Sequence, residues 1–160
     1  MIGPNGTKRG FTTAQVYKQL GYTFKNLAKI DLSDYTAGPA ISSGTASHPE
    51  GALVVDAKGT VWWVLNNTRQ GFQSVAVFNT YGFSFSKVVK ANSADLALPA
   101  GELVKFRDGT LVKEGAAIFL VSDGKKMLFT SMKAMTDRGY KATNAISASA
   151  SSYETGSSLE

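Results

Sequence analysis

The stretch FTTAQVYKQLGY, residues 11–22, recurs twice more along this chain. It returns as FQSVAVFNTYGF at 72–83 and as FTSMKAMTDRGY at 129–140. Each copy has an aromatic residue, a short polar step, helix-compatible residues, a glycine and a second aromatic. The copies begin 61 and 57 residues apart, and recurrence at such a period is typical of repeat proteins. The sequence therefore predicts tandem repeats.

Each copy also predicts a short helix with defined ends. A hydroxyl residue stands where an N-cap belongs, at Thr13, Ser74 and Ser131. About two turns later comes a glycine suited to a left-handed helix terminus, at Gly21, Gly82 and Gly139. The aromatics that follow, Tyr22, Phe83 and Tyr140, are expected to pack in the core or between repeats. A helix this short is unstable alone, so it must pack on neighbouring strands.

A hairpin is expected before each helix. Its turns are Asn5-Gly6, Asn66-Asn67 and Asp123-Gly124, and such pairs favour type I′ turns with positive φ at both positions. The runs 61–65 and 117–121 before the later turns are rich in β-branched and aromatic residues. We therefore expect an α+β fold of tandem repeats, each a small antiparallel β-meander followed by a two-turn helix. Equivalent burial is expected for Phe11, Phe72 and Phe129.

The repeats imply a division of the chain. We expect a partial repeat at 1–38, a linker at 39–48, full repeats at 49–101 and 102–156, and a cloning-tag scar at 157–160. The partial repeat begins at its hairpin turn, so the strand Thr7–Phe11 lacks its usual partner. Unpaired strand edges are templates for other strands. The strand can pair with an internal segment such as Ala40-Ile41, pair with a second molecule, or lie exposed at a sheet edge. Because Ala40-Ile41 is expected to start the next unit, we expect an exposed edge or self-association through Thr7–Phe11.

Composition narrows the class of protein. A chain of 160 residues with 43% hydrophobic content supports a real core. Disulfides and thiolate metal sites are excluded because the chain has no cysteine. No apolar run approaches the roughly 20 residues that span a bilayer. The net charge of +5 is spread among mixed signs without a standard nucleic-acid motif, so no specific nucleic-acid partner is expected.

The sequence contains no residue pattern that is typical of a catalytic site. The single histidine, His48, lies in the loop 47–50 and is expected to be exposed. One histidine without cysteines makes neither a metal cluster nor a conventional triad. Carboxylates such as Asp31 and Asp34 lie at turns, where aspartate usually caps and solubilises. We therefore expect no enzyme activity, no cofactor and no metal site.

Aromatic and basic side chains are the candidate ligand-binding residues. Trp62 and Trp63 are adjacent on a predicted strand, so they point to opposite faces. One enters the core, and the other stacks on a sugar ring or is covered by a neighbouring repeat. Lys8, Arg69 and Lys126 share one position, three residues before the repeat aromatic. They are either solvated positions beside a turn or one basic contact per repeat for an anionic polymer.

The combined pattern is similar to a known kind of sequence. Gly109-Thr-Leu-Val112, Asp123-Gly-Lys-Lys126, Phe129-Thr-Ser131, Gly139-Tyr140 and Tyr153-Glu-Thr-Gly156 carry the pattern. It resembles short repeats of about 55–60 residues and unassigned role in bacterial exported and cell-wall-associated proteins. The resemblance implies an extracellular or cell-surface accessory module and supplies no catalytic residues.

Two function classes follow. The first is a non-catalytic bacterial cell-surface module that binds cell-wall glycan or another surface polymer. The second is a structural or adhesive repeat that acts through protein–protein contacts or self-association. The sequence identifies neither the ligand nor the host process.

Overall fold

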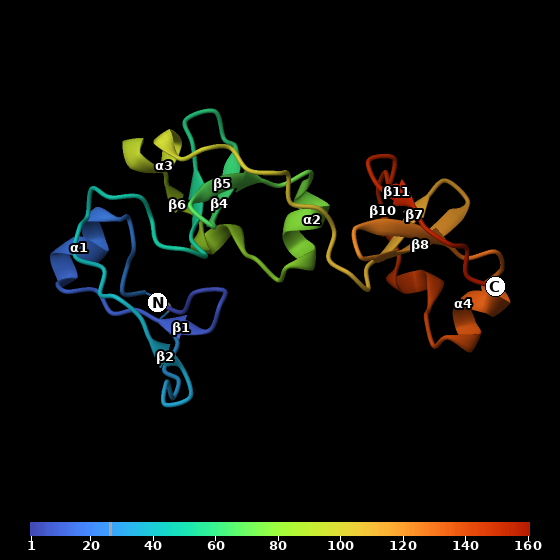
Figure 1. The fold of residues 1–160 in the computed structure, drawn as a ribbon, viewed down its shortest axis with the longest axis horizontal. Coiled ribbons are helices and arrows are strands. Elements are labelled where there is room, and N and C mark those ends of the chain that lie inside the picture. Colours follow the sequence, from blue (N-terminus) through green and yellow to red (C-terminus); the bar gives the residue numbers. More distant parts are fainter. Residues whose placement is uncertain (26) are drawn as a thin grey trace. The chain divides into compact units, whose positions relative to one another are not determined.

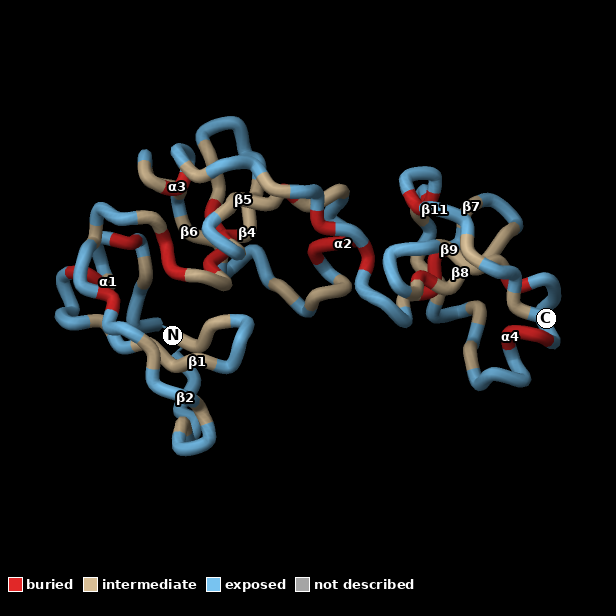
Figure 2. Tube along the Cα trace, in the orientation of Figure 1, coloured by how far each residue is buried: buried red, intermediate tan, exposed pale blue. Residues whose placement is uncertain are grey.

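The computed structural model describes residues 1–25 and 27–160, which form an α+β fold with four short α-helices and three β-sheets (Figure 1). Two compact units are present. The first joins Met1–Phe72 to Ser84–Leu103, and the second joins Gln73–Phe83 to Val104–Glu160. Buried residues lie in the helices and strands and also in connecting segments, such as those that carry Ile41, His48 and Tyr153 (Figure 2). No helix in the described part of the chain is long and apolar enough to cross a membrane.

The sheet of the first unit is built on a meander. It contains β3 (Leu53–Val55), β4 (Val61–Leu65) and β5 (Thr68–Gly71), joined antiparallel, and β6 (Val89–Lys90) lies parallel to β3. Asn66 and Asn67 have φ of 52° and 55°, as a type I′ turn requires. The predicted strand and turn are therefore both confirmed.

The second unit contains a comparable sheet. The strands β7 (Leu111–Glu114), β8 (Ala117–Ser122) and β9 (Lys125–Leu128) form its meander. The short strands β10 (Ile146–Ser147) and β11 (Glu154–Thr155) add in parallel to β7 and β9. The turn residues Asp123 and Gly124 have φ of 51° and 70°, which confirms this turn as well.

Three helices of six residues follow the strands as expected: α1 (Ala14–Gln19), α2 (Val75–Thr80) and α4 (Met132–Asp137). The hydroxyls of the predicted N-caps accept hydrogen bonds from the backbone N–H three residues on, at 3.1, 3.2 and 3.0 Å. The glycines after the helices have φ of 76°, 71° and 78°. Local sequence therefore sets both ends of each helix.

Three shorter helical segments complete the fold. The helix α3 (Ser93–Ala97) begins with a capping box, in which Asn92 and Asp95 each accept from the other's backbone N–H. Turns of 3₁₀-helix lie at η1 (Phe85–Lys87) and η2 (Ala142–Asn144). The repeat pattern predicted none of the three.

Phe11 and Phe129 occupy similar surroundings. Phe11 packs on the cluster of Val16, Leu20 and Ile41 and meets the Tyr22 ring edge-on at 5.7 Å. Phe129 packs with Leu111, Ala134 and Met135 and meets the Tyr140 ring edge-on, also at 5.7 Å. The ring of Phe72 stacks against Trp63 at 6.4 Å. Phe129 is buried, whereas Phe11 and Phe72 are half-buried, so the three phenylalanines are not equally buried as expected.

One backbone hydrogen bond recurs at the three glycines expected to close the repeats. Gly38 N–H donates to the Lys8 carbonyl, Gly101 to Arg69 and Gly156 to Lys126, at 2.9, 3.0 and 2.9 Å. Three residues after two of these glycines, Ile41 bridges Phe11 and Leu159 bridges Phe129 in parallel. Leu159 also packs on the Met135 cluster. Residues 157–160, expected to be a tag scar, therefore take part in the fold.

The first strand is paired on both sides, which contradicts the expected open edge. β1 (Thr7–Lys8) pairs in parallel with β2 (Thr36–Ala37). On its other side, Gly3 N–H donates to the Thr7 carbonyl and Arg9 N–H to the Met1 carbonyl. The expectation is wrong because residues 1–3 are long enough to pair with so short a strand. The reason for self-association through Thr7–Phe11 disappears with it.

The turn before β1 also differs from expectation. Within Asn5-Gly6, only Gly6 has a positive φ, of 74°. The Asn5 side-chain oxygen accepts from the Thr7 N–H at 3.1 Å. This Asx-type contact fixes the turn through a side chain, so a type I′ conformation is not needed.

The compact units are out of step with the expected repeats 49–101 and 102–156. The helix α2 directly follows β5 along the chain but belongs to the second unit. Gln73 N–H donates to the Val104 carbonyl, and the Tyr81 hydroxyl to the Lys105 carbonyl, both at 3.1 Å. The helix α1 likewise shares a unit with β3–β6. The helices α1 and α2 therefore each belong to one compact unit with strands that come after them.

Replacing Gly82 by valine should lower the free energy of unfolding by about 1–2 kcal/mol, because a β-branched side chain is penalised at positive φ. A Cβ at Gly82 would meet no atom within 4 Å, so the loss is conformational rather than steric. Urea denaturation followed by circular dichroism measures it. Gly82→Asn is the matched control, because asparagine tolerates this conformation. Equal stability of the valine and asparagine variants would contradict the prediction.

Candidate functional site

Trp62 is held by two neighbours within the first unit. Its indole N–H donates to an Asp56 carboxylate oxygen at 3.0 Å, and the Arg69 guanidinium lies 4.7 Å from the ring centroid. The hydrogen bond from Trp62 is the largest cause that lowers the pKa of Asp56. The ring also packs on the core of Val54 and Val64. Trp62 is therefore the tryptophan that faces the core.

Trp63 points to the other face of the strand. It lies between Leu53 of β3 and Gln70 of β5 in the sheet register, and it stacks on Phe72 with an angle of 16° between the rings. The ring is half-buried. Neighbouring side chains thus cover part of the ring that the sequence offered as a sugar-stacking surface.

Each of the three basic candidates has a partner within its own unit. Lys8 Nζ donates to the Leu32 carbonyl at 2.8 Å, and Arg69 Nε donates to the Leu98 carbonyl at 3.1 Å. Lys126 Nζ lies 5.2 Å from the centroid of Phe119. Cation–π contacts of this kind contribute about 0.5–1 kcal/mol at exposed sites. The contacts give these residues a local packing role.

An aromatic cavity of about 320 Å³ lies beside α1 in the first unit, and sequence reasoning did not single it out. Tyr17 lies at the centre of its aromatic wall. The Tyr17 ring stacks on Tyr22 at 5.3 Å, lies tilted against Phe24 at 4.7 Å, and meets Phe11 edge-on at 5.0 Å. Phe24, which contacts Tyr17 but does not itself line the cavity, is 55% exposed. The sequence signal was the alternation Tyr22-Thr-Phe24 after the helix glycine, which also suits a packing role.

The tyrosine hydroxyls of this cavity are hydrogen-bond donors. Burial raises the pKa of Tyr22 far above its ordinary value, and the nearby Asp95 charge and Tyr17 add to the shift. Tyr22 therefore keeps its proton and points it at the Met1 sulfur, 3.9 Å away. The Tyr17 hydroxyl donates to the Thr23 carbonyl at 2.6 Å. Lys25 and Lys87 also line the cavity.

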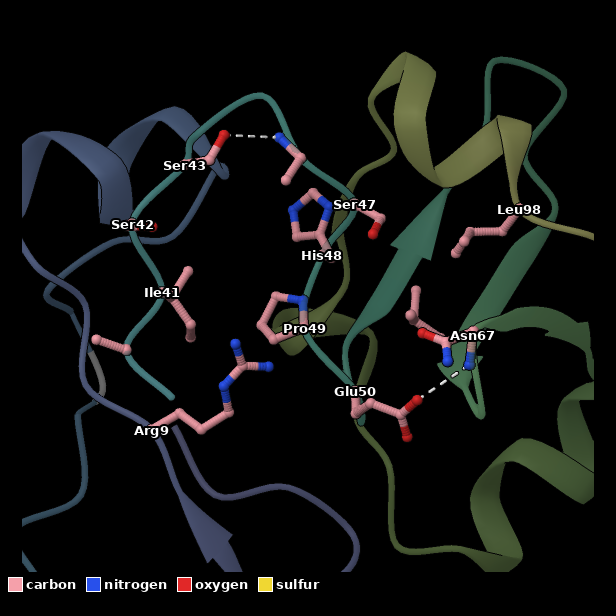
Figure 3. A pocket seen from close by; sticks show the side chains of 13 residues that line it. Arg9, Ile41, Ser42, Ser43, Ser47, His48, Pro49, Glu50, Asn67 and Leu98 are labelled. Atoms are coloured by element: carbon pink, nitrogen blue, oxygen red, sulfur yellow. Dashed lines mark hydrogen bonds between the residues drawn. The ribbon is translucent and has the colours of Figure 1, made fainter. Parts of the chain in front are cut away.

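His48 is buried, with 2% of its surface exposed, so the expectation of an exposed loop histidine is wrong (Figure 3). Its Nδ1 lies 2.7 Å from an Asp95 carboxylate oxygen, and its Nε2 lies 2.8 Å from the Leu20 carbonyl. Both partners are acceptors, so both hydrogen bonds form only when the ring carries both protons. The pair is therefore a buried hydrogen-bonded bridge between the end of α1 and the start of α3, and it is an ion pair whenever the ring is doubly protonated.

Asp95 is stabilised as an anion in this bridge. Burial, the largest single cause, raises the pKa of Asp95, but hydrogen bonds from the His48 ring, the His48 N–H and the Asn92 N–H together outweigh it and lower the pKa below 3.8. The Asp95 side chain is fully buried. The carboxylate also lies in the first turn of α3, where a negative charge is favoured.

The second unit has an uncharged counterpart of this bridge. Phe106 N–H donates to the Tyr153 hydroxyl, and the two rings stack at 6.2 Å. The two residues are separated by 47 positions, as are His48 and Asp95. In both units a backbone N–H is therefore anchored by a buried side chain of a later segment, which indicates a structural role for the pair.

Comparisons with known proteins give no match: no family model, curated protein or solved structure is similar to this chain. Among residues 1–25 and 27–160, no group of three or more His, Cys, Asp or Glu side chains is placed to hold a metal ion. The candidate sites therefore follow from geometry alone, and the aromatic cavity is the best formed for an extended ligand.

Asp95→Asn should lower the stability of the first unit by about 2 kcal/mol at neutral pH, because it removes charged hydrogen bonds from a buried site. The pKa of Asp95 is lower in the folded state, so the unfolded state binds more protons and the wild type loses stability as pH falls below 3.8. The variant should lose less stability on acidification than the wild type, because Asp56 in the same unit still contributes and Asp95 no longer does.

Urea denaturation at several pH values, followed by tryptophan fluorescence, measures the effect, since both tryptophans lie in the first unit. Asp137→Asn, an exposed position on α4 in the second unit, is the control. A variant that keeps the full acid loss of the wild type would show that Asp95 is not the titrating group.

Proposed function

We propose that this chain is a non-catalytic repeat module of the bacterial cell surface that binds polysaccharide, such as cell-wall glycan, in the aromatic cavity beside α1. The observation that supports the proposal is the row of contacting rings Tyr22, Tyr17 and Phe24: the two tyrosines line the cavity, and Phe24 lies beside it and is 55% exposed. Flat aromatic faces present apolar area at low entropic cost, and tyrosine adds a polar tip. The apolar faces of sugar rings need such a surface.

The size and charge of the cavity agree with this class of ligand. Its volume of about 320 Å³ lies within the usual range for ligand sites, and it suits a short segment of a glycan. Lys25 and Lys87 line it, and the chain carries a net charge of +5. These charges favour a glycan that bears acidic groups. We therefore assign the glycan contact to Tyr17 and Phe24, and a packing role to Trp62 and Trp63.

Tandem repetition is part of the proposal. The recurring features are the capped helices, the left-handed glycines, the two I′ turns and the hydrogen bonds of Gly38, Gly101 and Gly156. A unit made of a meander and a short helix accounts for all of them. The resemblance to repeats of exported proteins supports an extracellular or cell-surface location.

The chemistry of the site favours binding without catalysis. The single histidine has both ring nitrogens occupied and is buried with Asp95. A general base must reach a substrate proton, and this ring reaches only the protein. We therefore propose a module that holds its ligand and leaves it unchanged.

A structural or adhesive role is the second candidate, and one observation favours it. Large apolar side chains gather on the segment between α1 and β2, where Phe24, Leu27 and Ile30 are 55%, 57% and 53% exposed. Exposed apolar groups of this kind suit a protein partner as well as a sugar. Because Phe24 belongs to both hypotheses, Tyr17 and Ile30 must be tested separately.

Tyr17→Ala and Phe24→Ala should each weaken binding to purified bacterial cell-wall glycan about three- to tenfold, since an aromatic pair contributes roughly 0.5–1.5 kcal/mol. Sedimentation of the protein with insoluble glycan, at several protein concentrations, measures the affinity. Leu103→Ala removes an apolar side chain of similar exposure outside the cavity and is the control.

Saturable binding that survives both aromatic substitutions would overturn the assignment of the cavity. Loss of self-association or protein binding in Ile30→Ala, with glycan binding absent in the wild type, would favour the adhesive role. Circular dichroism of each variant separates loss of the site from loss of the fold.

A further inference from the structure

A second cavity of the first unit, of about 280 Å³, has quite different chemistry. The segment 40–50 forms one wall, Arg9 lies on one side, and Val64, Asn67 and Leu98 lie on the other (Figure 3). No residue lines both this polar cavity and the aromatic cavity. The polar cavity therefore needs a separate account.

Arg9 supplies a positive charge held in a fixed position. Its Nε donates to the Pro39 carbonyl at 2.7 Å, and Figure 3 shows the guanidinium pointing toward Pro49 and Ile41. The ion pairs found among the described residues are His48–Asp95 and Lys133–Asp137, so Arg9 has no carboxylate partner there. Its terminal nitrogens are left to bind water or a ligand.

Glu50 supplies a negative charge that is also fixed. One carboxylate oxygen accepts from the Asn67 N–H at 3.0 Å. Asn67 is in the type I′ turn between β4 and β5, so a rigid element positions the carboxylate. Glu50 has no cationic partner within the described part of the chain either, and its second oxygen is not used by these contacts.

The remaining wall contributes no unmatched charge. The His48 ring at the edge of the cavity is neutralised by Asp95. Ser43 accepts from the N–H groups of Thr45 and Ala46 and so orders the loop, while Ile41 and Pro49 are buried. One cation and one anion, each half-buried and each tied to backbone, thus face one small space.

We propose that this polar cavity binds a small zwitterion, a free amino acid or a dipeptide. Its carboxylate would pair with the Arg9 guanidinium, whose planar fork suits carboxylate recognition. Its ammonium group would pair with Glu50. A neutral ligand would leave the charges of both Arg9 and Glu50 unpaired. A ligand with a single charge would pair with one of these residues and leave the other unpaired. The volume of about 280 Å³ is sufficient for a ligand of this size.

The test uses the whole chain and the dipeptide alanyl-alanine as the probe. Titration followed by amide chemical shifts should show saturable binding in the millimolar range or tighter, with shifts at residues 40–50. N-acetyl-alanyl-alanine lacks the ammonium group and alanyl-alanine amide lacks the carboxylate. Each should bind about tenfold more weakly, because each loses a charge-assisted contact.

Variants then assign each charge to its partner. Arg9→Gln should remove the preference for the free carboxylate, and Glu50→Gln should remove the preference for the free ammonium, while Lys58→Gln, an exposed lysine outside the cavity, changes neither. Absence of dipeptide binding, or equal binding of all three peptides by the wild type, overturns the proposal. The comparison of the three peptides uses only the wild-type protein, so misfolding of a variant does not affect its result.

This outcome is separable from that of the glycan experiment. Tyr17→Ala and Phe24→Ala should leave dipeptide binding unchanged, because neither residue lines the polar cavity. Dipeptide binding lost in both aromatic variants would show that the peptide occupies the wrong cavity and would overturn the assignment to Arg9 and Glu50.

Discussion

A helix of six residues cannot hold its shape in water, because the gain from its few internal hydrogen bonds does not offset the cost of nucleation. Three such helices occur in this chain, and each survives through what surrounds it. Caps satisfy the first amides, a left-handed glycine ends each helix, and an aromatic residue anchors its start. The last requirement is an apolar surface to cover the inner face. For α4, Leu111, Ile118 and Leu120 of the preceding meander supply this surface. For α1, Ile41 and Met1 supply it.

Each unit contains a buried pair of side chains that joins distant segments, and the chemistry of the pair differs between the units. In the first, His48 receives the end of α1 and holds Asp95 at the start of α3, so opposite charges meet between two helix ends of suitable polarity. In the second, Phe106 and Tyr153 make a stacked neutral pair. A buried ion pair is weak evidence for added stability, since desolvation offsets much of its attraction. Its directional contacts, however, allow only one orientation of the segment that carries His48.

Local features were predictable from sequence, and distant contacts were not. Some features depend on only a few adjacent residues and can therefore be predicted from the sequence. These are the N-caps, the glycine termini and the turns at Asn66-Asn67 and Asp123-Gly124. The burial of His48 depends on Asp95, 47 residues away. The residues adjacent to His48 in the sequence do not predict this pairing. The pairing of residues 1–3 with β1 was missed because so short a segment carries no strand pattern. The two cavities were missed for the same reason, since each combines segments far apart in sequence.

The helix α2 belongs to the compact unit formed mainly by the residues after it. This assignment affects how the repeats could evolve. If the repeats arose by duplication, the segment that is copied and the body that folds have different boundaries. Gain or loss of one copy would place a helix in a compact unit with strands that had not evolved together with it. Selection would then act jointly on the segments of Tyr81 and Lys105, which the repeat pattern assigns to successive units and which a hydrogen bond joins within the second compact unit. Successive copies in such a lineage would have to diverge together, each constrained by the next.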